Sequence, residues 1–324
     1  MMHLLDAQAL RECLDMPSCI EAMRAVFIEV AEGRFHTPLR SRVRPPGGSA
    51  NGLTLMPALR ETTPRRWCLK EMVVTPANPA RGLDPLQGLV VLHDGDDGRV
   101  LAVADAPQLT TLRTAATSAL ATLTFARPGA RTVAVVGAGV QGRSHLQAMR
   151  SILPDAELRL WGRSPQKAAQ LAQEFGCTVA SSIEAAVRDA DVVCTVTAAA
   201  DPILQAGWIA DGCHVNAVGS STPAACEIEP ALMARARLFV DRRDAALAES
   251  GDVRRALAAG AITDAAIVAE LGDVLSGRAA GRSGDAEVTL YKSLGFGALD
   301  LAALELALQR APAAGAGQAM AWRS

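Results

Sequence analysis

The sequence has few aromatic residues, no excess of one charge and no long hydrophobic run. Aromatic side chains make up 3% of its 324 residues, with a single tyrosine, and the formal net charge is −2. Such a chain offers neither the electrostatic field nor the stacking surfaces that nucleic acids require. No run approaches the roughly 18 apolar residues of a membrane span, and the charged N-terminus is unlike a signal peptide. We therefore expect no nucleic-acid partner and no membrane association.

Cysteine and histidine patterns that would indicate a disulfide framework or a metal site are also missing. The seven cysteines form no CxxC pair, and their odd number in a long chain favours a reducing cytoplasm over disulfides. The five histidines do not cluster at metal-ligand spacing, and neither an HExxH nor a GxSxG motif is present. We expect no metal and no serine nucleophile, and interpret His145 and His214 as structural.

The first third of the chain predicts a mixed α and β segment. WCLKEMVVT (67–75) is typical of a strand, and LQGLVVLHD and RVLAVAD flank a GDDG turn, which together indicate one antiparallel sheet. Apolar residues at helical spacing predict a helix that ends near Gly33, and a second helix over 108–126. The stretch RPPGGSANG (44–52) predicts a turn-rich loop.

The sequence pattern changes after ARPGAR (126–131), which we interpret as a domain boundary. Apolar strands then alternate with helices, which is typical of a parallel, doubly wound sheet. The fold class is therefore α/β, with a Rossmann-type domain over 127–292 and a mixed α+β domain over 1–126. A C-terminal apolar helix within 293–324 is expected to complete the first domain, and the tail after Pro312 to be loosely ordered.

The segment VAVVGAGVQG places Gly137, Gly139 and Gly142 between an apolar strand and a helical pattern. The first glycine permits the turn, the second admits a pyrophosphate, and the third lets helix and strand pack closely. Free N–H groups at the helix N-terminus would then bind the phosphates. The alternative is a purely structural turn, but the alternation of strands and helices continues beyond it, which favours a dinucleotide site.

The end of the second strand bears on the choice of dinucleotide. An acid there would bind the adenosine ribose and favour NAD, but LRLWGRS ends in Gly162, Arg163 and Ser164. We predict a preference for NADP(H), with NAD(H) as the alternative if Arg163 and Ser164 are ordinary loop residues. Arg163→Ala with an acid introduced at Gly162 is expected to reverse the preference.

Several cations occur in apolar or small-residue surroundings. Lys70 shares a strand face with apolar residues, and a buried ammonium needs a partner. That partner could be a substrate carboxylate, Glu71 or solvent. Arg113 begins a stretch of small residues, LRTAATSALAT, and its fork suits a carboxylate or a phosphate unless it lies on a solvated face. Arg40 and Arg42 precede the loop at 44–52, where most arginines are merely solvated.

Six segments together resemble the ornithine cyclodeaminase and mu-crystallin family. They are LRTAATSALAT, VGAGVQGRSH, TVTAAADPIL, HVNAVGSSTP, ALAESGDV and YKSLGFGALD, in the same order over most of the chain. The resemblance implies a Rossmann domain joined to a substrate and dimerisation domain built from both chain ends, and a homodimer.

The resemblance also implies the residues of the site. Cations matching Arg40, or Arg42 in its place, with Lys70 and Arg113 hold the substrate carboxylate. The implied cofactor contacts are Gly137, Gly139, Val140 and Gln141 at the pyrophosphate, Arg163 and Ser164 at the 2′-phosphate, Thr195 and Thr197 along the cofactor, and Val218 and Lys292 near the nicotinamide.

Two departures from the cyclodeaminase pattern decide which reaction we expect. Ser221 stands where cyclodeaminases carry an aspartate, and YKSLG keeps a lysine where they carry an acid. Both favour NADPH-dependent reduction of a cyclic or open-chain 2-imino acid. Glu249 would stabilise the iminium or only brace a loop, and Lys70 or water would donate the proton. The alternatives are an ornithine cyclodeaminase, an alanine dehydrogenase that the absent ribose-binding acid disfavours, and a mu-crystallin-like binder of small ligands.

Overall fold

The computed structural model describes residues 1–47 and 50–321. The chain forms two compact units, one of Met1–Arg113 with Gly295–Ser324 and the other of Thr114–Leu294. The first division falls within helix α3 (Ala106–Phe125), upstream of the break at 126–131. The roles assigned above to the two domains stay a prediction. Of the loop expected at 44–52, residues 48–49 lie outside the described residues.

The first unit is built on a mixed sheet. Its described strands run in the order β16-β1-β7-β6-β5-β4-β2, and β3 pairs with β4. Their bounds are β1 (Met2–Leu5), β2 (Phe35–His36), β3 (Ser41–Val43), β4 (Gly52–Arg60), β5 (Arg66–Val74), β6 (Leu86–Asp94), β7 (Val100–Asp105) and β16 (Gln318–Met320). The predicted antiparallel arrangement of β5, β6 and β7 is confirmed.

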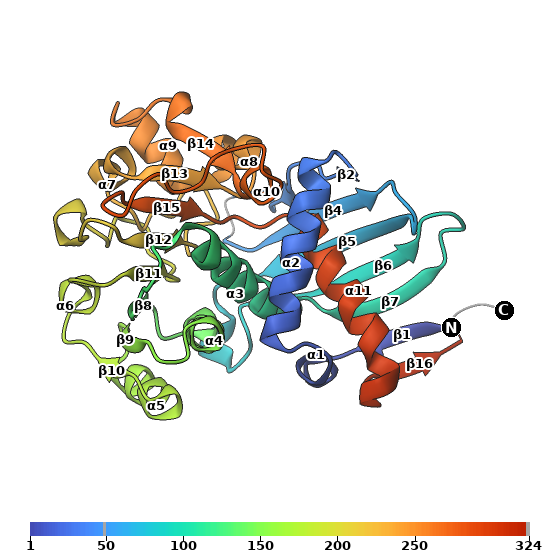
Figure 1. Ribbon diagram of the computed structural model, residues 1–324. Helices are drawn as coiled ribbons and strands as arrows, with labels where there is room; N and C mark the ends of the chain where they lie inside the picture. The colour runs from blue at the N-terminus through green and yellow to red at the C-terminus, as the bar shows by residue number, and fades with distance from the viewer. Residues whose placement is uncertain (48–49, 322–324) are drawn as a thin grey trace. The chain divides into compact units, whose positions relative to one another are not determined.

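Two long helices, α2 and α11, and the short helix α1 cover one face of this sheet (Figure 1). Helix α1 (Ala7–Cys13) and helix α2 (Met16–Ala31) begin at aspartate N-caps, and the Asp15 side chain accepts from the Ser18 amide at 2.8 Å. Helix α11 (Gly297–Ala314) packs on α2 and across β4, β5 and β6 (Figure 1). The helices bury the sheet face that carries Cys68, Lys70 and Met72.

The expected loose order after Pro312 is wrong for the described residues. Helix α11 continues through Pro312 to Ala314, because its alanine-rich end favours helix. Gly315 and Gly317 then adopt positive φ angles of 61° and 75°, and the chain turns back. Strand β16 pairs with β1 in antiparallel register, so the tail extends the edge of the sheet.

The opposite face of the sheet is largely apolar along four adjacent strands. Strands that face water on one side usually place polar residues there. Here Trp67, Val73 and Leu89 are 50%, 45% and 44% exposed. By register this face also carries the apolar residues Leu53, Leu55, Leu59, Leu69, Val91 and Val103, and the polar residues Glu71, Gln87, His93 and Asp105. A largely apolar, partly exposed face of this kind is typical of an interaction surface.

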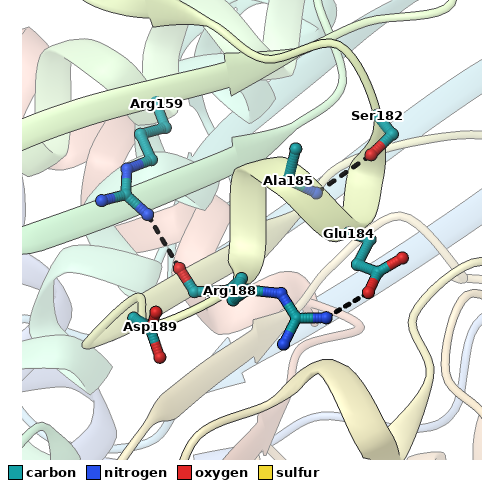
Figure 2. A pocket seen from close by; sticks show the side chains of 6 residues that line it. All are labelled: Arg159, Ser182, Glu184, Ala185, Arg188 and Asp189. Atoms are coloured by element: carbon teal, nitrogen blue, oxygen red, sulfur yellow. Dashed lines mark hydrogen bonds and ion pairs between the residues drawn. The ribbon is translucent and has the colours of Figure 1, made fainter.

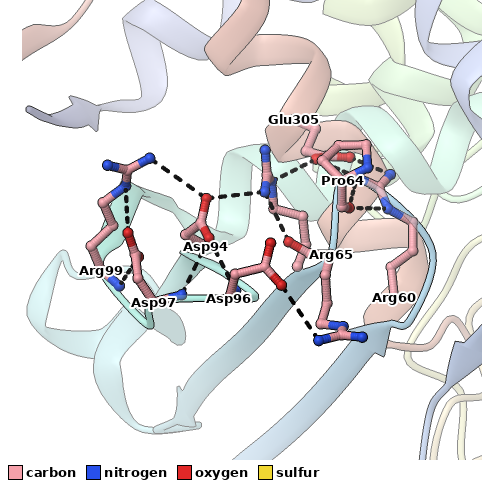
Figure 3. A network of polar contacts seen from close by, with 9 residues as sticks. Arg60, Pro64, Arg65, Asp94, Asp96, Asp97, Arg99 and Glu305 are labelled. Carbon is pink, nitrogen blue, oxygen red and sulfur yellow. Dashed lines mark hydrogen bonds and ion pairs between the residues drawn. The ribbon is translucent and has the colours of Figure 1, made fainter.

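The ends of β4 to β7 are joined to α11 by an ion-pair network (Figure 3). Arg60 donates from both terminal nitrogens to Glu305 of α11, at 2.6 and 2.7 Å. Arg66 bridges Glu305 and Asp94, at 3.1 and 3.3 Å. The network fixes the middle of α11 to the sheet through side chains that are about four-fifths buried.

The second unit contains the predicted doubly wound sheet. Its described strands run in the order β10-β9-β8-β11-β12-β15-β13-β14, and every pair is parallel. The strands are β8 (Thr132–Val136), β9 (Glu157–Trp161), β10 (Thr178–Val179), β11 (Val192–Thr195), β12 (His214–Ala217), β13 (Arg237–Val240), β14 (Ile267–Glu270) and β15 (Thr289–Lys292). Strand order reverses between β8 and β11, the switch point at which such sheets bind ligands.

Short helices connect these strands. They are α4 (Val140–Ile152), α5 (Pro165–Phe175), α6 (Ile183–Val187), α7 (Pro230–Arg235), α8 (Arg243–Glu249), α9 (Gly251–Ala258) and α10 (Leu271–Leu275). The central strands are buried on both faces, as expected of parallel strands covered by helices. The predicted helices near 140–152 and 165–175 are confirmed.

Candidate functional site

A glycine turn joins β8 to α4 at the switch point. Gly137 has a φ of 131°, and a Cβ at Gly142 would lie 1.9 Å from the Gly137 oxygen, so strand and helix are in close contact. A Cβ at Gly139 would meet nothing within 4 Å, and neighbouring Val140 is 69% exposed. The backbone at Gly139 is therefore open to a ligand at a helix N-terminus. This geometry fits a pyrophosphate.

The loop after β9 lies against this turn. A Cβ at Gly162 would lie 2.4 Å from the Ala138 Cβ. The acid that the proposed double substitution introduces at Gly162 would therefore require the turn to move. Arg163 is exposed, and Ser164 is the N-cap of α5, accepting from the Lys167 amide at 3.4 Å. No acidic residue stands at the end of this strand.

The loops after β11 and β12 are tied together by a buried acid, Glu227. Its two oxygens accept from the Thr195 hydroxyl at 2.9 Å and from both the amide and the hydroxyl of Thr197 at 2.7 Å. The Gly219 amide also donates to it, at 2.7 Å. Burial raises the pKa of Glu227, while nearby Lys292 opposes that rise. The predicted cofactor contacts Thr195 and Thr197 are thus held by an internal carboxylate.

A second acid, Asp252, holds the segment that carries Glu227. Its Oδ1 accepts from the amides of Glu227 and Ile228, at 2.7 and 3.0 Å. Its Oδ2 lies 2.9 Å from Lys292 Nζ, which also donates to the Ala217 oxygen at 3.1 Å. Burial opposes the charge on Asp252, but Lys292 and the two amides hold its pKa below the ordinary value. Lys292 itself is fully buried, at the carboxyl ends of β12 and β15, and Asp252 is the acid that pairs with its charge.

The remaining predicted residues of this unit lie close in the chain to that network. Val218 follows β12, and its amide donates to the Thr195 oxygen at 3.0 Å. Ser221 lies in the loop between β12 and Glu227. Glu249 ends α8 and is 8% exposed. It precedes Gly251, where a Cβ would lie 1.8 Å from the Ala225 oxygen.

The predicted cations gather in the first unit, around an acid that sequence reasoning missed. Lys70 is 3% exposed, and its Nζ lies 2.8 Å from Oδ2 of Asp300. Arg113 is 4% exposed, and its Nε donates to Oδ1 of the same carboxylate at 3.1 Å. The partner of Lys70 in this structure is therefore Asp300, which was not among the partners considered. Arg40 joins the cluster by donating from Nη2 to the Gly295 oxygen, at 2.8 Å.

Arg40 lies close enough to Lys70 to act on its charge. Burial lowers the pKa of Lys70 to about 8; Asp300 opposes the change, and Arg113 and Arg40 add to it. Burial opposes ionisation of Asp300, but Lys70 and Arg113 hold its pKa below the ordinary value. Arg42 lies on β3, opposite Thr54. The four named residues carry three positive charges and one negative, a balance that suits an added carboxylate.

Both buried histidines are fixed by internal hydrogen bonds. His145 lies between Ser118 Oγ at 2.9 Å and the Gln141 oxygen at 2.8 Å, and burial lowers its pKa to about 4. His214 lies 3.0 Å from Thr289 Oγ1, and burial lowers its pKa to about 3. Neutral, fixed rings of this kind agree with a structural interpretation.

A surface pocket of about 380 Å³ is lined by residues of α6, by residues on both sides of α6 and by Arg159 (Figure 2). Its polar groups bind one another: Arg159 donates to the Arg188 oxygen at 2.8 Å, and Ser182 caps α6. The loop from α6 leads into β11 and so lies at the amino ends of the parallel strands. The glycine turn lies at their carboxyl ends, so this pocket is separate from the candidate site.

The acids that organise the two clusters carried only weak sequence signals. Asp300 is an acid within the apolar helix GALDLAALELAL, and Glu227 lies in CEIEP without any spacing rule. A charge in an otherwise apolar helix indicates a buried partner, which was the signal available for Asp300. Nothing in the local pattern indicates that the Glu227 side chain binds the loops after both β11 and β12.

The fold and these residues define a Rossmann-type α/β protein with a separate buried cation cluster. The chain belongs to the ornithine cyclodeaminase/mu-crystallin family, whose model matches residues 2–314. No helix among residues 1–47 and 50–321 is long and apolar enough to cross a membrane.

Relatives and solved structures of this family match most of the chain. It is 37% identical over 238 residues to Δ1-pyrroline-2-carboxylate reductase of Paracoccus denitrificans, covering 72% of this chain and 75% of the relative. It is 37% identical over 291 residues to ketimine reductase mu-crystallin of Rattus norvegicus, covering 89% of each. The structure of Thermococcus litoralis Δ1-pyrroline-2-carboxylate reductase with NADH and L-proline matches with a TM-score of 0.92 and 28% identity, covering 98% of this chain and all of that one.

Proposed function

We propose that this protein catalyses the reversible, NAD(P)H-dependent reduction of a cyclic or open-chain 2-imino acid. In the reductive direction a hydride adds to the imine carbon and a proton adds to the nitrogen, which gives the amino acid and the oxidised coenzyme. The observation that carries the proposal is the cluster of the half-buried Arg40 with the buried Lys70 and Arg113. It supplies a carboxylate site in a chain whose relatives are named for imine reduction.

The second unit would hold the coenzyme. Gly137, Gly139, Val140 and Gln141 would contact the pyrophosphate, because the Gly139 backbone is open and α4 begins there, while Gly142 would let α4 pack closely on the turn. A bound nicotinamide coenzyme would supply the hydride. Thr195 and Thr197 would lie along the coenzyme, and Val218 and Lys292 would lie near the nicotinamide, at the carboxyl ends of β11, β12 and β15.

We propose NADPH as the preferred coenzyme. Arg163 and Ser164 follow β9 where an acid would favour NADH, and the loop lies against the glycine turn. An exposed guanidinium and a hydroxyl are suited to a 2′-phosphate. The T. litoralis relative was solved with NADH, so NADH is the competing candidate in the test.

The cation cluster would bind and orient the substrate carboxylate. Holding both reactants in one geometry lowers the barrier because the entropy of their encounter is lost on binding rather than in the reaction. With its pKa lowered to about 8 by burial, Lys70 holds a proton at neutral pH that it can release more readily than an ordinary lysine. Lys70 or a water molecule would protonate the nitrogen. Glu249 and Ser221 would line the substrate side of the nicotinamide, Glu249 stabilising the iminium.

We also propose that the protein is a homodimer joined through the apolar face of the first unit's sheet. Burying a face that includes Trp67, Val73 and Leu89 removes exposed apolar surface from water. Trp67→Glu would then give a monomer of half the mass by light scattering. Val179→Glu, at an exposed apolar position of β10 in the second unit, is the matched control and would leave the mass unchanged.

The experiment that tests the activity is oxidation of NADPH and NADH with a panel of imino acids. Cyclic imines such as Δ1-pyrroline-2-carboxylate and open-chain imines formed from 2-oxo acids and ammonia or methylamine are compared, with ornithine as control. Net coenzyme oxidation with an imine supports the proposal. Proline and ammonia from ornithine without net oxidation would show a cyclodeaminase instead, and no turnover with tight binding of a small acid would show a binder.

A further inference from the structure

One short segment at the start of α11 contacts all three cations of the cluster. The Gly295 oxygen accepts from Arg40, and a Cβ at Gly295 would lie 2.5 Å from Nη1 of Arg113. Five residues further on, Asp300 binds Lys70 and Arg113 with its two oxygens. The cations themselves come from separate places: the loop before β3, strand β5 and helix α3.

Contacts on two sides restrain the Arg113 guanidinium within the first unit. Its Nε faces Asp300, and its two terminal nitrogens face the Gly295 backbone, where Gly295 has a φ of 73°. A side chain at Gly295 would displace the guanidinium, and a positive φ disfavours one in any case. The Lys70 ammonium is restrained by Asp300 and by the Thr110 hydroxyl at 3.4 Å.

We propose that Asp300 is a positioning residue for the substrate carboxylate site, acting through Lys70 and Arg113. This inference rests on the proposed function of the cluster. Asp300 is fully buried, so we expect it to contact Lys70 and Arg113 and not the substrate. In this way it would keep the two cations in place while the substrate binds. It also reduces the repulsion among three neighbouring cations, which would otherwise move apart or lose a proton.

A merely stabilising ion pair would behave differently from a positioning one. Buried pairs contribute little net stability, and their removal acts mainly by leaving the partner charges uncompensated. If Asp300 positions Lys70, its loss changes the titration of that amine and the affinity for carboxylates. The charged groups that face Lys70 are Asp300 from α11, Arg113 from α3 and Arg40 from the loop before β3, with Cys68 beside it on β5.

The chain offers a direct readout, because it contains only three lysines, at positions 70, 167 and 292. Lysine-selective ¹⁵N labelling of the full-length protein follows each side-chain amine through a pH titration without any turnover. In Asp300→Asn we expect Lys70 to titrate at lower pH than in the wild type, because a carboxylate that favours the ammonium is gone. Affinity for pyrrole-2-carboxylate, a planar carboxylate probe, should fall about tenfold or more at pH about 7.5.

Glu305→Gln is the matched control on the same helix. Glu305 binds Arg60 and Arg66, so its loss changes a buried ion pair of α11 without touching Lys70. It should lower the thermal midpoint but leave the Lys70 titration and probe affinity unchanged. If Asp300→Asn does not fold, Asp300→Glu keeps the charge and displaces the carboxylate, so we expect weaker probe binding with a Lys70 titration close to wild type.

An unchanged Lys70 titration in Asp300→Asn, with probe affinity equal to that of Glu305→Gln, would overturn the inference. Wild-type affinity for the probe in Asp300→Glu would do the same. Failure of the proposed function gives another pattern: the wild type itself would neither bind the probe nor turn over imines, whatever the state of Asp300.

Discussion

Each unit of this protein contains a buried cluster of charges, and the two clusters have opposite balances. The first combines Arg40, Lys70 and Arg113 with the single acid Asp300. The second combines Glu227 and Asp252 with the single cation Lys292. Apart from Arg40, which is half-buried, the charged residues of both clusters are almost fully buried.

The acids of the second cluster are used by the fold itself. Glu227 accepts four hydrogen bonds from Thr195, Thr197 and Gly219, and Asp252 accepts backbone amides. Such charge-assisted bonds satisfy the carboxylates and fix the loops after β11 and β12. In the first cluster the cations bind Asp300 and, from Arg40, the Gly295 oxygen, and they outnumber the named acid three to one. The comparison shows that the acids of the second cluster hold loops in place, whereas the first cluster has an excess of positive charge that suits an added carboxylate.

The largest expected effect is that of Lys70→Ala. Loss of a buried cation that pairs with the substrate should lower kcat/KM for every carboxylate substrate about a hundredfold, because removing one partner of a buried charge pair costs about 3 kcal/mol or more. Steady-state NADPH oxidation measures it, with Arg159→Ala in the surface pocket as control. Kinetics equal to wild type would remove Lys70 from the site.

Coenzyme choice tests a different part of the second unit. Arg163→Asp should reverse the preference for NADPH, because it replaces a cation beside the 2′-phosphate by an acid that can bind a ribose hydroxyl. Charge-assisted bonds contribute about 1.5–3 kcal/mol, so the ratio of Kd values should change about tenfold or more. Fluorescence titration with both coenzymes measures it, and equal wild-type affinities would contradict the predicted preference.

Glu227→Gln tests whether the acidic cluster shapes the coenzyme site. The amide is similar in size, but it cannot accept from Thr197 and Gly219 together without turning an NH₂ group toward one of the donors. We expect NADPH affinity to fall about tenfold, while carboxylate binding in the first unit is unchanged. Thr195→Val removes a single donor and should have a smaller effect. Equal NADPH affinity in all three proteins would show that Glu227 only stabilises the fold.

The smallest expected effect concerns acid stability. Burial lowers the pKa of His145 from its ordinary 6.5 to about 4, so the unfolded chain binds more protons than the folded one between these values. Its contribution to stability is present above pH about 6.5 and is lost as pH falls toward 4. Between pH about 7.5 and 5.5, wild type should lose about 1 kcal/mol more than His145→Gln in urea unfolding. Equal losses of unfolding free energy in the two proteins would show that protonation of His145 does not contribute to the acid sensitivity of the fold.

Much of the fold followed from periodicity and turn chemistry. The strands on both sides of GDDG and the glycine turn between β8 and α4 were predicted because their signals are local. The tail after Pro312 was missed, because its strand exists only through pairing with β1 at the other end of the chain. The apolar outer face of the sheet was also missed, since its register across four strands is not a local property.

In the candidate site, too, sequence reasoning selected some residues and missed others. Residue types and family segments were enough to select Lys70, Arg113 and the glycine turn. The acids Asp300 and Glu227 were missed, because their partners lie far away in the chain: Asp300 is 187 positions from Arg113, and Glu227 is 32 from Thr195. Nothing in the sequence indicated that an acid introduced at Gly162 would crowd the glycine turn, where a Cβ would lie 2.4 Å from the Ala138 Cβ.

The sequence by itself determined the order of strands and helices, the open turn at Gly139 and the presence of cations in apolar surroundings. These depend on side-chain periodicity and on backbone freedom, which act over a few residues. Only the tertiary structure decided that Arg40 gathers with Lys70 and Arg113, and that Asp300 and Glu227 organise the two clusters. Such pairings depend on which distant segments share a buried space, where an ion or amide without a partner is costly.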